Sequence, residues 1–89
     1  IETCYYLRFS MHDTPGVLSK ATTIMAEVGI SIEAIIQKEE PLGIDYVDVI
    51  VITKSITELH LNLALKKIQQ LDTVEGDAVI IRLERLDQV

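Results

Sequence analysis

The sequence predicts an α+β domain of the ferredoxin-like class, in which a four-stranded antiparallel sheet carries two helices on one face. Three observations support this class. Hydrophobic residues recur with strand, helix, strand, strand, helix and strand periods, in that order. Each helical segment has a single apolar face, and both helices can bury this face against one side of the same sheet. The chain has 89 residues, which is enough for one domain and too few for two.

A change of hydrophobic period marks the first strand and the first helix. Residues 3–11 alternate, which places on one face the side chains of Tyr5, Leu7, Phe9 and Met11. From Pro15 to Val28 the apolar residues follow helical spacing instead. Thr14 is the expected N-cap, with Pro15 in the first helical position, where a missing N–H costs nothing. Gly29 is expected to end this helix.

The remaining elements follow from the same reasoning. Further strands are predicted over residues 30–38, 44–54 and 74–86, with a turn over 39–43. The near-continuous apolar run 49–52 predicts that its strand is buried on both faces. Ser55 and Glu58 match the S-x-x-E capping box and predict the start of the second helix. Leu59 and Leu63 lie off the apolar stripe of that helix, where they are available to another surface.

Composition and charge argue against several classes of function. The net charge of −6 and the isoelectric point near 4.7 disfavour binding to nucleic acid or to an anionic membrane surface. No apolar run approaches the ~20 residues of a membrane span, and we expect no signal peptide. The single cysteine, Cys4, is expected to be a small buried hydrophobe. A reducing cytoplasm is the expected location.

Catalytic and metal-binding patterns are missing from the sequence. His12 and His60 are far apart, and neither has a cysteine or carboxylate at metal-ligand spacing. Cys4 has no neighbouring base, and the chain lacks both glycine-rich phosphate-binding motifs. We therefore expect no catalytic residue, no metal and no cofactor in this chain.

The stretch HDTPG at residues 12–16 is a candidate binding loop, because it joins a strand end to a helix start. The first N–H groups of a helix and its partial positive charge suit a carboxylate. Gly16 allows a ligand to approach the backbone closely, and the negative charge of Asp13 suits an ammonium group. Together these groups suit an amino acid zwitterion. The alternative is that Asp13 and Thr14 only cap the helix.

The same junction carries a family resemblance. A D-x-P-G-V-L motif is formed there by Asp13, Pro15, Gly16, Val17 and Leu18. This motif and the stretch GISI at 29–32 resemble the ACT domain, a regulatory module of amino-acid metabolism. Across segments 5–39 and 47–58 the sequence is similar to the C-terminal ACT domain of bacterial homoserine dehydrogenases. Residues 1–89 are then expected to be an ACT domain excised from a longer enzyme, as the start at Ile1 close to a strand also suggests.

The resemblance implies a parent that reduces aspartate semialdehyde to homoserine with NAD(P), through upstream catalytic domains outside this chain. For this chain it implies feedback sensing, with threonine as the first-choice effector and a homodimer of ACT units. The implied effector contacts are Asp13, Gly16, Val17, Leu18, Ile30, Ser31 and Gln37. Ser31 stands where many ACT sites have asparagine, and its hydroxyl reaches less far.

Two alternatives stay open. The first is the ACT module of another protein, such as a ppGpp synthetase/hydrolase, an aspartate kinase or an acetolactate synthase regulatory subunit, although the stretches YYLR at 5–8 and IQ at 36–37 favour homoserine dehydrogenase. A purely structural dimerisation module without a ligand is the alternative of a different class.

Overall fold

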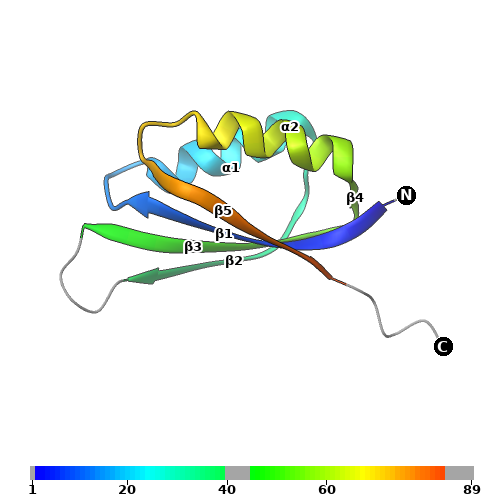
Figure 1. Cartoon of the computed structure of the whole chain (residues 1–89), viewed down its shortest axis with the longest axis horizontal. Helices are drawn as coiled ribbons and strands as arrows, with labels where there is room; N and C mark the ends of the chain where they lie inside the picture. The colour runs from blue at the N-terminus through cyan, green and yellow to red at the C-terminus, as the bar shows by residue number, and fades with distance from the viewer. Residues whose placement is uncertain (1, 40–44, 84–89) are drawn as a thin grey trace.

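The computed structural model describes residues 2–39 and 45–83, which form an antiparallel sheet with two helices on one face (Figure 1). The elements in chain order are β1 (Glu2–His12), α1 (Val17–Val28), β2 (Ile32–Glu39), β3 (Tyr46–Thr53), β4 (Ile56–Thr57), α2 (Glu58–Gln69) and β5 (Val74–Leu83). In the sheet β1 is central and lies between β3 and β5, while β2 forms the edge beyond β3. The predicted ferredoxin-like class is confirmed, with the two-residue strand β4 as an addition.

The core lies between the sheet and the two helices. In β1 the four apolar side chains predicted to share a face are all buried there, because alternate residues of a strand point to the same side. They meet the apolar stripes of α1 and α2, which bury Val17, Ala21, Met25, Leu61, Ala64, Leu65 and Ile68. The helical spacing in the sequence therefore identified the core face of both helices.

Strand β3 corrects one prediction. Its residues alternate between buried and half-buried, so Val49 and Val51 face the helices while Ile50 and Ile52 lie on the opposite face. No described element covers that opposite face, which we call the open face of the sheet. Burial of β3 on both faces, predicted from the continuous apolar run, is therefore wrong. Apolar composition alone does not tell a covered face from an open one.

The start of α2 also differs from the prediction. The N-cap is Thr57, whose hydroxyl accepts a hydrogen bond from the backbone N–H of His60 at 3.3 Å. Ser55 and Glu58 do not form a capping box. The physical reason is that Ile56 and Thr57 pair with the beginning of β1, and this extended pairing delays the helix until Glu58.

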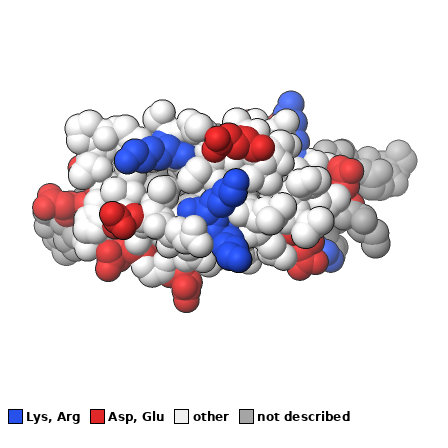
Figure 2. Space-filling model, turned by 90° about the horizontal axis from the view of Figure 1, so that it is seen from above, with Lys and Arg blue, Asp and Glu red and all other residues white. Residues whose placement is uncertain are grey.

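Two surface features bear on partners. Viewed from the helix side, the acidic and basic side chains of the described residues are interspersed among uncharged ones (Figure 2). Neither described helix has the length and hydrophobicity needed to cross a membrane. Residues 40–43 of the predicted turn lie outside the described part of the chain. Residues 84–86 of the last predicted strand also lie outside it.

Candidate functional site

The candidate loop is built on a tight turn between β1 and α1. The Val17 N–H donates to the Thr14 carbonyl at 3.2 Å, which closes a four-residue turn with Pro15 and Gly16 in its centre. Gly16 has φ +82° and ψ −1°. Proline followed by a residue with positive φ is the arrangement of a type II turn. Thr14 is therefore not the N-cap and Pro15 does not hold the first helical position, so both predictions are wrong. The reason is that Gly16 has a left-handed backbone, so the helix begins only at Val17.

The first turn of α1 presents backbone donors at this loop. Gly16 is the N-cap, and its carbonyl accepts the first helical hydrogen bond from the Lys20 N–H at 3.1 Å. No side chain caps the helix. The N–H groups of Leu18 and Ser19 are therefore left without a partner among residues 2–39 and 45–83, since helical bonding begins only at Lys20. Open space surrounds Gly16, with no heavy atom within 4 Å of where a Cβ would stand.

Asp13 is exposed beside this helix start. Its backbone N–H donates to the Asp45 carbonyl at 2.8 Å, which ties the loop to the residue before β3. Its carboxylate does not cap α1, and neither does the Thr14 hydroxyl. The interpretation that these two residues only cap the helix is therefore wrong. The loop thus carries an exposed carboxylate in the segment that leads to two backbone donors at the start of α1.

The other predicted contacts lie away from the loop. Ile30 and Ser31 follow the far end of α1, and twelve helical residues at 1.5 Å each separate the two ends by about 18 Å. Gly29 ends the helix as predicted. Ile30 follows it and is buried in the core, where its N–H donates to the Met25 carbonyl at 2.9 Å. Ser31 is exposed. One copy of the chain does not bring these residues to the loop.

Gln37 lies on the edge strand β2, opposite Val49 of β3. Because directly paired residues share a face, Gln37 points to the helix side of the sheet. Its side chain is exposed, and the neighbouring residue on that face, Ile35, is 39% exposed. The helix-side surface of β2 is therefore accessible to another molecule.

The structure also reveals a cluster that the sequence reasoning missed. The His12 ring lies against Tyr46, with ring centroids 4.5 Å apart, and its Nε2 is 3.3 Å from the Glu75 carboxylate. These side chains come from β1, β3 and β5, at the end of the sheet next to the candidate loop. Strand alternation places His12 on the open face, but its partners depend on the register of two other strands. The cluster connects the end of β1, where the loop begins, to β3 and β5.

The fold and the family comparison define the class of this domain. Within the described ranges, no three His, Cys, Asp or Glu side chains lie close enough together to hold a metal ion. The described chain is a small α+β module whose loop between β1 and α1 ends at an uncapped helix start. Residues 5–73 match the family model of the ACT domain, and the chain belongs to this family. It is an ACT regulatory domain.

Comparison with known proteins narrows the family further. The chain is 41% identical to the homoserine dehydrogenase of Pseudomonas aeruginosa over 97% of its own length and 20% of that protein. A homoserine dehydrogenase structure from Thiobacillus denitrificans has a TM-score of 0.84 and 42% identity, covering 94% of this chain and 18% of that one. The ACT domain of a GTP pyrophosphokinase from Chlorobium tepidum shares the fold, with a TM-score of 0.70 and 13% identity over 93% of this chain and all of that domain.

These comparisons confirm the resemblance to the ACT domains of homoserine dehydrogenases. The chain spans about a fifth of the length of the curated relatives it matches.

Proposed function

We propose that this chain is the effector-sensing domain of a homoserine dehydrogenase and that threonine is the effector. The observation that carries the proposal is the uncapped start of α1 in a loop that also holds the exposed Asp13. The similarity to homoserine dehydrogenases supports this parent over an aspartate kinase, a ppGpp synthetase/hydrolase or an acetolactate synthase subunit. Feedback control of threonine and methionine biosynthesis would follow.

In the proposed complex the threonine carboxylate accepts hydrogen bonds from the N–H groups of Leu18 and Ser19. The partial positive charge of a helix N-terminus favours an anion there. The Asp13 carboxylate receives the ammonium group. Gly16 and Val17 contribute their backbone, because Gly16 leaves open space and the Val17 side chain is buried in the core.

We further propose that a second copy of the chain completes the site. Ser31 and Gln37 are exposed, but they lie on other parts of the fold than the loop of the same copy. Pairing along the accessible edge strand β2 would bring these residues of one copy toward the loop of its partner. Ile30 contributes only its backbone, because its side chain lies in the core. Effector binding then changes how two copies associate, which is how a ligand shifts a conformational equilibrium.

The parent enzyme is proposed to reduce aspartate semialdehyde to homoserine with NAD(P) in the cytoplasm. Its cofactor and catalytic residues are proposed to lie in other domains. This chain contributes regulation through the site around Asp13 and Gly16.

A thermal-shift screen against amino acids tests the proposal. Threonine should raise the melting temperature in a concentration-dependent way, because a ligand that binds only the folded state stabilises it by mass action. D-Threonine is the matched control and should have little effect. A shift with a different amino acid would overturn threonine as the effector. No shift with any amino acid would support the ligand-free dimerisation module instead.

A further inference from the structure

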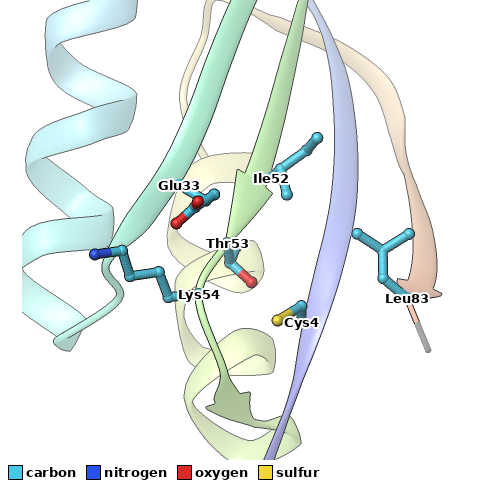
Figure 3. A pocket seen from close by; sticks show the side chains of 6 residues that line it. All are labelled: Cys4, Glu33, Ile52, Thr53, Lys54 and Leu83. Carbon is cyan, nitrogen blue, oxygen red and sulfur yellow. The ribbon is translucent and has the colours of Figure 1, made fainter. Parts of the chain in front are cut away.

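We infer that a cavity at the opposite end of the sheet is a second small-molecule site, which takes a small aliphatic zwitterion. The cavity has a volume of about 250 Å³ and is lined by Cys4, Glu33, Ile52, Thr53, Lys54 and Leu83 (Figure 3). At about 3.3 Å per residue along β1, Cys4 lies roughly 26 Å from His12 and the candidate loop. The cavity is thus separate from the site proposed above.

The lining combines opposite charges with apolar walls. Glu33 and Lys54 lie on one side of the cavity, Cys4 and Leu83 lie on the other, and Thr53 lies between them (Figure 3). The side chains of Glu33 and Lys54 are exposed at the mouth. Neither forms an ion pair with any residue that the structure describes. Both charges are therefore available to a ligand.

A β-bulge places Glu33 at the cavity. Ile32 pairs with Thr53 and Ala34 pairs with Ile52, so Glu33 is an extra residue on β2 without a counterpart on β3. Bulges redirect side chains and are frequent beside functional sites. If Glu33 were not extra, every following residue of β2 would lie on the opposite face of the sheet.

Thr53 supplies a buried hydroxyl in the cavity wall. It is 1% exposed, and its oxygen accepts a hydrogen bond from the Tyr5 N–H at 3.1 Å. That bond leaves the hydroxyl proton as a donor. A ligand carboxylate between Thr53 and Lys54 would accept a hydrogen bond from this hydroxyl.

The ligand class follows from these groups. Lys54 and Thr53 suit a carboxylate, Glu33 suits an ammonium group, and the side chains of Ile52 and Leu83 suit a short aliphatic body. The volume lies below the ~300 Å³ at which pockets for drug-sized molecules begin, so the ligand is small. An α-amino acid with a short aliphatic side chain has all of these properties.

Titration of L-valine into the 89-residue chain, followed by backbone amide NMR, tests this inference. We expect shifts at Cys4, Ile52, Lys54 and Leu83, and none at Leu18 or Ser19. Valinamide lacks the carboxylate and isovalerate lacks the ammonium group, so both should bind about tenfold more weakly, as expected for losing a charged hydrogen bond. Shifts confined to the loop at 13–19 would overturn the cavity site while supporting the proposed effector site.

Charge-neutral variants assign each ligand group. Glu33→Gln should abolish the preference for valine over isovalerate, and Lys54→Gln should abolish the preference over valinamide. Glu27→Gln and Lys66→Gln are matched controls on exposed helix surfaces and should keep both preferences. If valine moves no cavity amide at millimolar concentration, or if Glu33→Gln keeps its preference for valine over isovalerate, the inference is wrong.

Discussion

At the scale of single residues, Gly16 has two separate roles in the account. Its φ of +82° is needed for the type II turn, and the open space beside it admits the proposed ligand. The Pro15–Gly16 pair fits either a helix start or a turn, because proline is favoured in the first position of both. The sequence therefore located the junction between strand and helix but not the geometry of its turn. The hydrogen bond from the Val17 N–H to the Thr14 carbonyl distinguishes the turn from a helix start.

Gly16→Ala should lower the free energy of unfolding by about 1–2 kcal/mol, because alanine is strained in the left-handed region. It should also weaken threonine binding at least tenfold, since the new methyl group enters the ligand space. Gly76→Ala is the matched control, because Gly76 has φ +70° and open space but lies outside the proposed effector contacts. Denaturant unfolding and calorimetry measure the two effects. Equal binding losses in both variants would mean that strain, not contact, is responsible.

The N-cap of α2 provides a second test at this scale. Thr57→Ala should destabilise the chain by about 1 kcal/mol, because it removes the acceptor for the His60 N–H. Ser55→Ala should change stability by less than about 0.5 kcal/mol, as is usual at an exposed position without special contacts. Urea unfolding of both variants distinguishes them. A larger loss for Ser55→Ala would instead favour the capping box.

At the scale of elements, hydrophobic periodicity predicted the features of the fold that depend on local sequence. The order of strands and helices and the buried face of β1 followed from the spacing of residues such as Leu7 and Phe9. Features that depend on distant pairing could not be predicted in this way. The delay of α2 requires β4 to pair with β1, and the open face of β3 depends on which elements cover the sheet.

Core and surface positions should differ sharply in their effect on stability. Phe9→Ala should cost about 3–5 kcal/mol, because Phe9 is fully buried between sheet and helices and leaves a cavity. In a small domain this is enough to unfold much of the population. Leu59→Ala, at a position 69% exposed, should cost less than about 0.5 kcal/mol. Similar losses in chemical unfolding would contradict the observed placement of the core.

At the scale of the whole molecule, the proposed effector site needs two copies of the chain. The loop at 13–18 and the residues Ser31 and Gln37 face different surroundings in one chain, although the sequence resemblance places them in one site. Nothing in a single sequence states which residues of a site belong to a partner copy. This part of the candidate site was therefore predicted only as a set of residues, and its assembly remains our proposal.

Ile35→Lys should disrupt pairing along β2. Ile35 is 39% exposed on the helix-side surface of the edge strand, where a charge would be buried in the paired form. We expect sedimentation to show a dimer for the unmodified chain with threonine and a monomer for the variant, with little change in the unfolding of the monomer. Asn62→Lys at an exposed polar position of α2 is the control and should stay dimeric. A strict monomer in all samples would contradict pairing.

Calorimetric titration of threonine into the chain measures effector binding at the candidate loop. We expect saturable binding of one threonine per copy. Asp13→Asn should weaken this binding at least tenfold, because the substitution removes the charge that receives the ammonium group. Absence of threonine binding, or binding of unchanged affinity in Asp13→Asn, would contradict the account.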